Sequence, residues 1–362
     1  MATPVVIDGL IFESQPTGGI ARIYRELLQQ IDPDSVQFEL LLAQGKAQQI
    51  PTVKTRMIRP IDHLFKPLRL FALERYARQF AVALSKPDPR AIWHSSYFSQ
   101  PPSSWQGAIV CALYDMTHEK FPTLFDGFAT RQFVRHKKLC VQQAAVVACI
   151  SASVRTDALE IYGGDPEKYR VIQLARSSVF QQRTINLVQR PFILYVGSRH
   201  HPYKNFGLLL DAYAQWEKHK DIDLLVVGDK ATSVESNKIK NRQIPVHFLT
   251  DIDDSKLSVL YNQASAFIYP SLYEGFGIPL LEAMACGCPI VASRIPSSLE
   301  VAGDIAYFFA PDDPAALIDA LDEALADGRN SQRIQAGLAH CQQYSWQKTA
   351  AETLALYQEF AI

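Results

Sequence analysis

One segment of this chain combines the sequence of a buried strand with that of a glycine turn and a helix start. Residues 266–270 form a short apolar run, Ala-Phe-Ile-Tyr-Pro, typical of a parallel strand that is covered on both faces. Gly275 and Gly277 allow a tight turn without side chains after this strand. Pro279 fits the first helical position, and Gly287 fits the residue just past the helix end. The segment therefore predicts one strand, turn and helix of a parallel α/β sheet.

The helix start in this segment is suited to bind an anion. The N–H groups of Phe276, Gly277 and Ile278 lie where the aligned peptide dipoles of a helix favour negative charge, such as a diphosphate. Glu274 precedes the turn and Glu282 falls near the first helical turn, so two carboxylates flank the predicted anion site. Carboxylates accept hydrogen bonds from hydroxyl groups. Two acids beside an anion site predict a ligand rich in hydroxyl groups, such as a nucleotide sugar.

The two glutamates stand in a wider sequence context. Glu274 and Glu282 have seven residues between them, within Pro-Ser-x-Tyr-Glu-Gly-Phe-Gly-x-Pro-x-x-Glu-Ala-Met-Ala-x-Gly-x-Pro. This pattern resembles the Glu-x7-Glu motif of retaining GT-B glycosyltransferases of family 4. The resemblance implies that Glu274 binds sugar hydroxyls, that Glu282 binds the nucleotide ribose, and that Gly275 belongs to the donor-binding turn. The alternative is an ordinary exposed pair on a surface helix, which the surrounding motif disfavours.

A second segment supports the same interpretation. Residues 191–198, Pro-Phe-Ile-Leu-Tyr-Val-Gly-Ser, have the pattern of a buried strand that ends in a glycine turn. Ligands of open α/β sheets bind beyond such strand ends, and the resemblance places Gly197 and Ser198 at the donor site. Arg199 and Lys204 match the basic pair that grips the donor diphosphate in the resembling family. The alternative is two solvated surface cations.

Two further strand ends complete the predicted donor pocket. Residues 223–229 repeat the pattern of a strand followed by glycine, and residues 246–251 precede a predicted helix from about 254 to 264. In the resembling family these strand ends surround the nucleotide, and the second reads the base with main-chain groups. The residues assigned to this contact are Val227, Gly228, Leu249, Thr250 and Ile252.

The first half of the chain also alternates strands and helices. Strands are predicted near residues 4–9, 38–43, 91–95, 108–114, 145–150 and 170–174. Helices are predicted near residues 19–30, 127–143 and 153–162, the last capped by Ser151 or Ser153. This alternation predicts a parallel sheet with right-handed crossovers. The second half repeats it from 192 to about 325, so the expected fold is the α/β GT-B architecture, two Rossmann-like domains with parallel sheets that face a deep cleft.

The length of the chain predicts two domains. It has 362 residues, which exceeds the size of about 250–300 residues at which one hydrophobic core stops growing. We predict an N-terminal Rossmann-like acceptor domain over residues 1–178 and a C-terminal Rossmann-like nucleotide-sugar donor domain over residues 179–345. By the resemblance, residues 346–362 form a helix that crosses back to the N-terminal domain. A linker is expected around Ser178 to Arg190.

Two segments of the first half are candidates for the rest of the site. Gly18 and Gly19 let backbone N–H groups approach the reacting phosphate or sugar, although a glycine pair at a helix start is common. Asp115 ends an apolar run, and His118 follows in a predicted loop. Many relatives carry a His-Asp pair at this strand end, and Tyr114 occupies the histidine position here. Either Asp115 or His118 is therefore the candidate that holds the donor hexose or receives the acceptor proton.

The overall composition is that of an ordinary globular protein. With a formal charge of −1 and 48% hydrophobic residues, nothing indicates a nucleic-acid partner. The opening residues lack the charged start and long apolar run of a signal peptide, which predicts a cytoplasmic protein. Residues 54–78 mix basic and apolar side chains. This mixture predicts either peripheral contact with the inner face of the cell membrane or a solvated basic face over a packed core.

These features together predict a retaining hexosyltransferase of polysaccharide or cell-envelope biosynthesis that uses no cofactor and no metal ion. The predicted donor is a UDP-sugar, UDP-glucose foremost, and the acceptor is a saccharide or lipid-linked saccharide. GDP-mannose-dependent mannosyl transfer is the alternative. Arg199, Lys204 and the helix start at Gly277 would stabilise charge on the leaving diphosphate. Glu274 would orient the sugar, while the leaving phosphate helps to deprotonate the acceptor.

Three other protein classes share parts of this pattern. A GT-B epimerase would need acid and base groups on both ring faces, and the Glu-Gly-Phe-Gly segment argues against it. A non-catalytic nucleotide-sugar-binding protein is disfavoured by opening residues that lack an export signal and by the combination of Arg199, Lys204, Glu274 and Glu282. A NAD-dependent dehydrogenase would need Gly-x-Gly-x-x-Gly after the first strand, and Asp8-Gly-Leu-Ile-Phe-Glu does not supply it.

Overall fold

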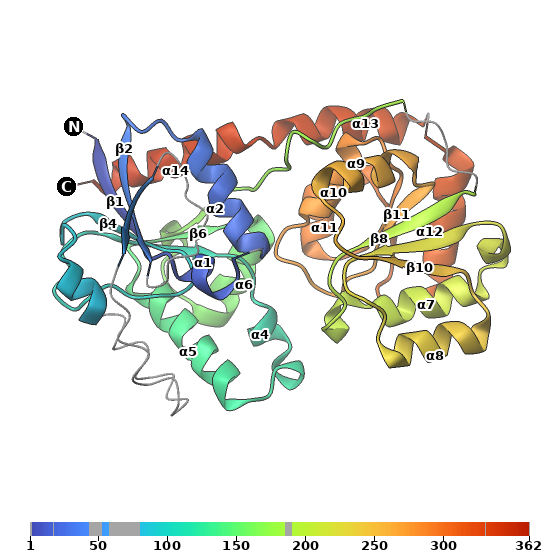
Figure 1. Cartoon of the computed structure of the whole chain (residues 1–362), viewed down its shortest axis with the longest axis horizontal. Helices are drawn as coiled ribbons and strands as arrows, with labels where there is room; N and C mark the ends of the chain where they lie inside the picture. The colour runs from blue at the N-terminus through green and yellow to red at the C-terminus, as the bar shows by residue number, and fades with distance from the viewer. Residues whose placement is uncertain are drawn as a thin grey trace. The chain divides into compact units, whose positions relative to one another are not determined.

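The computed structural model of the chain describes residues 2–16, 18–42, 53–57, 80–184, 190–329 and 331–361. The chain forms two compact units, shown in Figure 1. Unit 1 comprises Met1–Leu174 together with Ser345–Ile362, and unit 2 comprises Ala175–Tyr344. The division therefore falls before the predicted boundary at residue 178, and the C-terminal helix belongs to unit 1.

The described part of the predicted linker around Ser178 to Arg190 packs within unit 2. Phe180 is fully buried, and its ring centroid lies 5.9 Å from that of Tyr261. The backbone N–H of Arg183 donates to the side-chain oxygen of Asn262 at 2.7 Å. The described part of the predicted linker is therefore packed into unit 2.

Unit 1 is built on a parallel sheet in which seven strands are described. Their order is β3-β2-β1-β4-β5-β6-β7, and every pair of neighbours is parallel. The strands are β1 (Thr3–Ile7), β2 (Val36–Leu42), β3 (Lys54–Met57), β4 (Ile92–Ser95), β5 (Ile109–Leu113), β6 (Val146–Cys149) and β7 (Tyr169–Val171). The predicted strands of this half are confirmed, and β3 is an additional strand.

Strand β3 begins the segment 54–78 that the sequence analysis assigned to a membrane or to a solvated basic face. It pairs with β2, and Arg56 Nε forms an ion pair with Glu39 Oε1 at 2.6 Å. Residues 54–57 are therefore part of the sheet. Residues 58–78 of the predicted segment lie outside the described residues.

Helices cover both faces of this sheet (Figure 1). They are α1 (Leu10–Ser14), α2 (Gly19–Gln30), α4 (Thr117–Lys120), α5 (Phe128–Gln143), α6 (Ala152–Tyr162) and α14 (Trp346–Glu359), with the 3₁₀ turns η3 (Pro122–Leu124) and η4 (Pro166–Lys168). Helices α2 and α14 pack side by side, and α5 lies on the opposite face. Ser151 caps α6, because its Oγ accepts from the Val154 N–H at 3.0 Å.

Unit 2 is built on a second parallel sheet, with the strand order β10-β9-β8-β11-β12-β13. The strands are β8 (Phe192–Val196), β9 (Asp223–Val227), β10 (Val246–Leu249), β11 (Ala266–Tyr269), β12 (Ile290–Ser293) and β13 (Tyr307–Phe309). Every residue of β11 and β12 is buried. Unbroken apolar sequences of this kind are typical of parallel strands that are covered on both faces.

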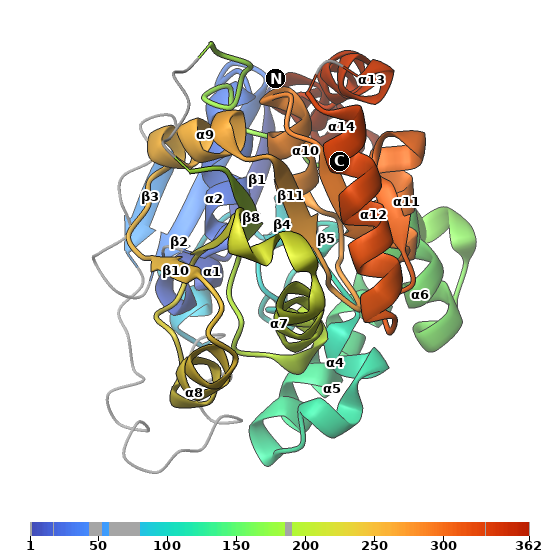
Figure 2. The same ribbon diagram turned by 90° about the vertical axis from the view of Figure 1, so that its right-hand side faces the viewer.

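The helices of unit 2 also lie on both faces of its sheet (Figures 1 and 2). They are α7 (Phe206–Gln215), α8 (Ser233–Arg242), α9 (Asp254–Gln263), α10 (Ile278–Ala285), α11 (Pro296–Ala302), α12 (Pro314–Asp327) and α13 (Gln332–His340), with the 3₁₀ turns η5 (Pro202–Lys204), η6 (Glu217–Lys220), η7 (Gly303–Ile305) and η8 (Cys341–Gln343). Helices α7 and α12 pack together, whereas α10 contacts α9, α11 and α13. Leu209 and Leu210 of α7 form one hydrophobic core with Leu317 and Leu321 of α12.

Each sheet contains one topological switch point, where the strand order reverses. It lies between β1 and β4 in unit 1 and between β8 and β11 in unit 2. Ligands of open parallel sheets bind beyond the carboxyl ends of the strands at such a point. These two places are therefore the first to compare with the predicted site residues.

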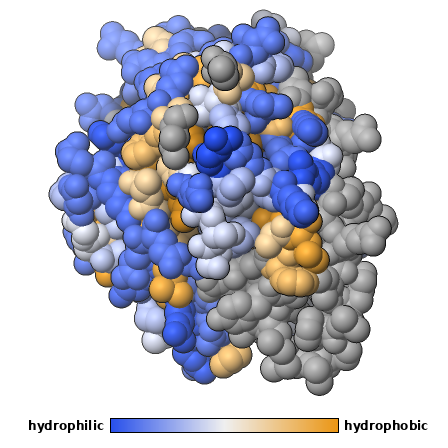
Figure 3. Space-filling model, turned by 90° about the vertical axis from the view of Figure 1, so that its left-hand side faces the viewer, coloured by the Kyte–Doolittle hydropathy of each residue, from blue (hydrophilic) through white to orange (hydrophobic). Residues whose placement is uncertain are grey.

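The surface view in Figure 3 shows a face on which hydrophilic side chains prevail, with apolar side chains in limited patches. Among the described residues, Phe80, Leu84, Phe128 and Val234 are the most exposed large apolar side chains. None of the helices in the described ranges has the length and hydropathy that a membrane-spanning helix requires.

Candidate active site

An ion pair joins the segments that follow β8 and β11, at the switch point of unit 2. Lys204 Nζ lies 2.7 Å from Glu274 Oε1, and the two side chains are 23% and 14% exposed. Ser271 Oγ also donates to Glu274 Oε1, at 2.7 Å. The structure thus brings together two of the predicted catalytic residues, and it adds Ser271, whose role the sequence analysis missed.

Main-chain contacts hold these two segments together. The Leu272 N–H donates to the Tyr203 carbonyl oxygen at 2.7 Å. Asn205, which precedes α7 with a left-handed φ of 56°, donates from Nδ2 to the carbonyl oxygens of Pro270 at 3.0 Å and Pro311 at 2.7 Å. The position of Lys204 relative to Glu274 is therefore fixed by the loops on which they stand.

Helix α10 starts directly after the glycine turn, as predicted. Gly277 has a φ of 123°, and a Cβ there would lie 2.9 Å from Leu280 Cδ1, so glycine is required. The helix begins at Ile278, which makes Pro279 its second residue and not its first. Gly287, just past the helix end, has a φ of 61°. The side chain of Phe276 is buried against Tyr344, which leaves only its main chain for the predicted ligand contact.

Glu282 lies inside α10 and is only 4% exposed. Tyr261 OH donates to its Oε2 at 3.4 Å. Burial and the neighbouring Glu282 charge raise the pKa of Tyr261, so its hydroxyl stays protonated and able to donate. The predicted ribose contact would use a carboxylate that is already held by a buried tyrosine, a partner that the sequence analysis did not identify.

Arg199, predicted to grip the donor diphosphate, is buried. Its side chain is 2% exposed, and its Nε donates to Glu235 Oε1 at 3.0 Å. Withdrawing one member of a buried ion pair costs about 3–5 kcal/mol. A charged hydrogen bond to a phosphate would contribute only about 1.5–3 kcal/mol. In this structure Arg199 is therefore held by Glu235, whereas Lys204 is partly exposed.

The strand ends assigned to the nucleotide lie next to one another. The Gly197 N–H donates to the Val227 carbonyl oxygen, and the Gly228 N–H donates to the Leu249 carbonyl oxygen, both at 3.0 Å. Thr250 and Ile252, which follow β10, are half-buried. The main-chain role of these residues stays a prediction.

Ser198 contacts the acid that follows β9. Burial alone would raise the pKa of Asp229, but a hydrogen bond from Ser198 and the charges of His200 and Arg199 lower it overall. The carboxylate is therefore ionised near neutral pH and binds the segment after β8 to the segment after β9.

Asp8 occupies the switch point of unit 1. It follows β1, is fully buried, and accepts from the N–H groups of Leu10 and Ser96, each at 3.0 Å. The hydroxyl groups of Ser96 and Ser99 donate to the same carboxylate. Ser96 and Ser99 lie about ninety residues along the chain from Asp8, so the local sequence could not show this role.

Asp115 stands at the end of β5 with a side chain that is 38% exposed. Its Oδ1 accepts from the Thr117 N–H at 2.9 Å, and Lys137 Nζ lies 3.9 Å from the same oxygen. Lys137 is 1% exposed, and its Nζ also donates to the Asp115 carbonyl oxygen at 2.5 Å and to Glu119 Oε2 at 2.9 Å. A buried lysine that the sequence analysis missed therefore fixes the position of Asp115.

His118 lies on the short helix α4 and not in a loop. Its ring centroid is 4.4 Å from that of Phe125 and 4.9 Å from that of Phe133. The ring is half-buried among aromatic side chains. Of the two alternatives for this strand end, Asp115 has a side chain that is 38% exposed, whereas Nδ1 of His118 is buried.

Tyr114, at the usual histidine position of the resembling family, belongs to a buried hydrogen-bonded chain. Its hydroxyl oxygen lies 2.9 Å from Tyr24 OH and 3.1 Å from the Ser96 carbonyl oxygen, both within hydrogen-bond distance. Tyr24 OH lies 2.8 Å from His94 Nε2, and His94 Nδ1 lies 2.5 Å from Tyr357 OH. Burial lowers the pKa of His94 to about 4. The chain is therefore neutral at pH 7, and it links α2, β4 and the end of β5 to α14.

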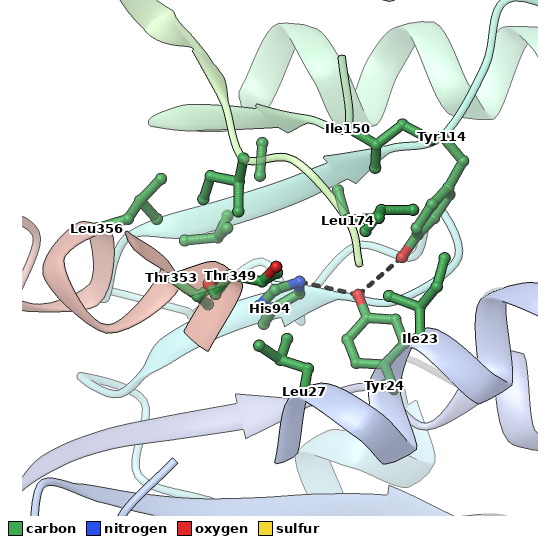
Figure 4. Close-up of a pocket in the computed structure, with 14 residues that line it drawn as sticks. Ile23, Tyr24, Leu27, His94, Tyr114, Ile150, Leu174, Thr349, Thr353 and Leu356 are labelled. Atoms are coloured by element: carbon green, nitrogen blue, oxygen red, sulfur yellow. Dashed lines mark hydrogen bonds between the residues drawn. The ribbon is translucent and has the colours of Figure 1, made fainter. Parts of the chain in front are cut away.

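A cavity of about 40 Å³ adjoins this chain inside unit 1 (Figure 4). His94, Tyr24 and Tyr114 line it together with apolar side chains and with Thr349 and Thr353 of α14. Burial raises the pKa of Tyr24 and of Tyr114, so both hydroxyls stay protonated. All the residues that line the cavity belong to unit 1.

Gly18 and Gly19 stand at the start of α2, as predicted. A Cβ on Gly18 would lie 2.9 Å from Gln15 Oε1, whereas a Cβ on Gly19 would meet nothing within 4 Å. The space beside Gly19 is compatible with the predicted approach of a ligand. Within the described ranges there is no group of three or more His, Cys, Asp or Glu side chains that could hold a metal ion.

The motifs of unit 2 correspond to a known family. Residues 179–337 match the model of the glycosyl transferases group 1. This region contains Lys204, Glu274 and Glu282, and it lies entirely within unit 2. The assignment of family 4 and of a retaining mechanism is finer than this match.

Curated relatives align with a larger part of the chain. The O-antigen chain mannosyltransferase B of Escherichia coli is 29% identical over 60% of this chain and 61% of its own length. The MMP alpha-(1->4)-mannosyltransferase of Mycolicibacterium hassiacum is 31% identical over 63% of this chain and 57% of its own length. The chain thus spans about three fifths of the length of these relatives.

The fold has counterparts among solved structures. Sucrose-phosphate synthase from Thermosynechococcus elongatus superposes with a TM-score of 0.77 and 19% identity, covering 99% of both chains. At this identity the likeness shows the fold alone. Two Rossmann-like α/β domains with parallel sheets, shared with GT-B glycosyltransferases, are therefore confirmed.

Proposed function

We propose that the protein is a retaining glycosyltransferase that moves a mannosyl group from GDP-mannose to a saccharide or lipid-linked saccharide acceptor. The observation that carries this proposal is the Lys204–Glu274 ion pair at the β8/β11 switch point, next to the start of α10. The names of the aligned relatives favour mannose. UDP-glucose, the donor first expected from the sequence, becomes the alternative.

In the proposed reaction the bond between the anomeric carbon and the donor phosphate oxygen breaks, and GDP leaves. The acceptor oxygen forms the new bond on the same face of the sugar, and its proton passes to the leaving phosphate. Lys204 and the free N–H groups at the start of α10 stabilise the charge that develops on the diphosphate. Glu274 binds sugar hydroxyls and orients the ring. Because Lys204 and the N–H groups at the start of α10 already supply positive charge, the proposed transfer needs no metal ion.

On the acceptor side we assign the polar contact to Asp115. Its carboxylate is partly exposed and is held by the Thr117 N–H and by buried Lys137. His118 packs against two aromatic rings and is the weaker candidate. Membrane contact through residues 54–78 stays a prediction, since most of that segment lies outside the described residues.

The role of Glu274 is tested by Glu274→Gln, which keeps the shape of the side chain and removes its charge. We expect kcat to fall by about 10²–10³, the loss typical of one preorganised electrostatic group, with GDP affinity largely kept. Glu323→Gln, on the exposed face of α12, is the matched control. Turnover of Glu274→Gln near the wild-type rate would remove this residue from the mechanism.

The donor is tested by calorimetric titration of GDP and UDP, followed by transfer assays with GDP-mannose and UDP-glucose in the presence of a chelator. We expect tighter binding of GDP, consumption of GDP-mannose and retention of the anomeric configuration in the product. Preference for UDP and UDP-glucose would establish the alternative donor. Loss of activity with the chelator would show that a metal ion is needed, and failure to bind either nucleotide would contradict the proposed function.

A further inference from the structure

Arg199 connects the segments that follow two neighbouring strands of unit 2. It lies just after β8, and its Nη2 donates to the carbonyl oxygens of Asp229 at 2.7 Å and Lys230 at 3.0 Å. Both of these residues follow β9. The guanidinium plane presents several N–H donors in one rigid fork, so a single side chain can hold two carbonyl groups and a carboxylate at once.

The same guanidinium packs on two aromatic rings. Its Cζ lies 4.8 Å from the ring centroid of Phe248, in β10, and 5.1 Å from that of Phe206, at the start of α7. Cation–π contacts are strongest where the cation is desolvated, and Arg199 is 2% exposed. Arg199 thus contacts the elements that carry the ends of β8, β9 and β10, the region assigned to the nucleotide.

The carboxylate partner of Arg199 is itself fixed. Glu235 Oε1 accepts from Arg199, and Glu235 Oε2 accepts from the Thr232 N–H at 2.7 Å. Thr232 Oγ1 accepts in return from the Glu235 N–H at 3.2 Å, which completes a capping box at the start of α8. Because Glu235 caps a helix and pairs with Arg199, it holds the guanidinium in its buried position.

The remaining nitrogen of the guanidinium, Nη1, is buried and has no hydrogen-bond partner. It lies against Gly228, where an added Cβ would come within 3.6 Å of it and within 2.4 Å of the Gly197 carbonyl oxygen. The close approach of these strand ends therefore requires glycine and leaves no exposed face of Arg199 for a phosphate.

We propose that Arg199 is a positioning residue that sets the spacing of the nucleotide-binding segments after β8, β9 and β10, and is not a ligand of the diphosphate. The inference rests on the proposed function, because it names what Arg199 does for the nucleotide of the donor. Lys204 then remains as the side chain that contacts the diphosphate directly.

Calorimetric titration with guanosine, GMP and GDP, and with uridine, UMP and UDP, tests this role. A positioning residue acts on the whole nucleotide. Arg199→Met should therefore weaken the binding of the nucleoside, the monophosphate and the diphosphate of the preferred base by the same factor, about tenfold. Arg199→Lys should not restore binding, since an ammonium group cannot reproduce the forked contacts. A direct ligand of the diphosphate would instead give a loss confined to GDP or UDP, and lysine would restore part of it.

Two variants serve as controls. Lys204→Met should weaken the binding of the diphosphate and leave the affinity for the nucleoside unchanged. Arg333 makes the same kinds of contact elsewhere in unit 2, with the Asp304 carbonyl oxygen at 2.9 Å, Glu323 Oε1 at 3.3 Å and the Tyr307 ring at 4.5 Å. Arg333→Met should therefore leave all nucleotide affinities unchanged.

Glu235→Gln provides a second route where Arg199→Met does not fold. It keeps the shape of the buried pair and removes its charge, so we expect a smaller loss that is again equal for nucleoside and diphosphate. A loss confined to the diphosphate in the Arg199 and Glu235 variants overturns the inference and leaves the proposed function intact. Failure of the wild-type protein to bind any of the six ligands overturns both.

Discussion

The switch points of the two units have the same topology but opposite chemistry. In unit 1 the carboxylate of Asp8 is fully buried and accepts from two N–H groups and from the hydroxyls of Ser96 and Ser99. In unit 2 the carboxylate of Glu274 reaches solvent and pairs with Lys204, which is also partly exposed. At the switch point of unit 1 the carboxylate is buried and bound by neutral donors, which we call the closed point. At that of unit 2 the carboxylate is partly exposed and bound by a cation, which we call the open point.

This difference shows that a topological switch point is not by itself a binding site. The buried carboxylate of Asp8 joins the end of β1 to the end of β4, because both of its oxygens accept hydrogen bonds from the protein. A ligand that displaced those donors would leave the carboxylate without hydrogen-bond partners. An ion pair whose two side chains are partly exposed is less costly to separate than a fully buried one, so its members can exchange partners with a charged or hydroxyl-bearing ligand. We therefore expect substitutions at the unit 1 point to affect stability and those at the unit 2 point to affect binding.

The largest effect in this comparison is expected for Asp8→Ala. Removal of the carboxylate leaves buried N–H and O–H donors without an acceptor, so we expect unit 1 to lose about 4 kcal/mol of unfolding free energy. Urea unfolding, with hydrogen exchange of the β4 peptides, measures this loss. Asp32→Ala, which removes an exposed carboxylate, should change the free energy by less than about 0.5 kcal/mol. A loss below about 1 kcal/mol for Asp8→Ala would show that the two switch points are not as different as proposed.

Lys204→Met tests the other side of the comparison. It removes one charge-assisted contact to the diphosphate, so we expect GDP to bind about 10- to 100-fold more weakly. The unfolding free energy should change by less than about 1 kcal/mol, because the pair with Glu274 is partly exposed. Lys218→Met is the control, since Lys218 forms an exposed ion pair of the same 2.7 Å length with Asp322. Unchanged GDP binding in Lys204→Met would remove the unit 2 point from the donor site.

The open site was easier to predict from the sequence than the closed one. Glu274, the glycine turn and Pro279 are neighbours along the chain, and local rules for turns and helix starts place them correctly to within one residue. Lys204 was predicted from its resemblance to the basic pair of the family, and the structure places it beside Glu274. Local sequence could not show that Arg199 is buried, because Glu235 and Phe248 lie on other elements.

The polar interior of unit 1 could not be predicted for the same reason. Tyr24, His94, Tyr114 and Tyr357 come from α2, β4, the end of β5 and α14, and the sequence separations between partners reach 263 residues. Each of them, taken alone, is an ordinary residue of an amphipathic helix or an apolar strand. Only the packing of the four elements turns them into one hydrogen-bonded chain.

The buried hydrogen-bonded side chains around His94 make the stability of unit 1 depend on pH. Burial lowers the pKa of His94 from 6.5 to about 4 in the folded protein, so between these values the unfolded chain binds one more proton. Stability is fully present above pH 6.5 and is lost as the pH falls towards 4, by about 2 kcal/mol at pH 5. Urea unfolding at pH 7 and pH 5 measures this loss. His94→Gln should remove the pH dependence from this source, and an undiminished slope in that variant would show that another group titrates.

The smallest effect is expected for Tyr114→Phe. This variant tests whether the buried hydroxyl of Tyr114 in unit 1 also contacts a substrate. The hydroxyl of Tyr114 is hydrogen-bonded with Tyr24 OH and the Ser96 carbonyl oxygen, so its removal should cost about 1 kcal/mol of unfolding free energy. Turnover should stay within about twofold of wild type, because this hydroxyl is buried inside unit 1 and a neutral internal hydrogen bond contributes to stability and not to the reaction. Parallel measurements of unfolding and mannosyl transfer separate the two quantities. If turnover falls tenfold or more while stability is unchanged, Tyr114 has taken over the sugar contact of the histidine usual at this position, and unit 1 contains a second open site.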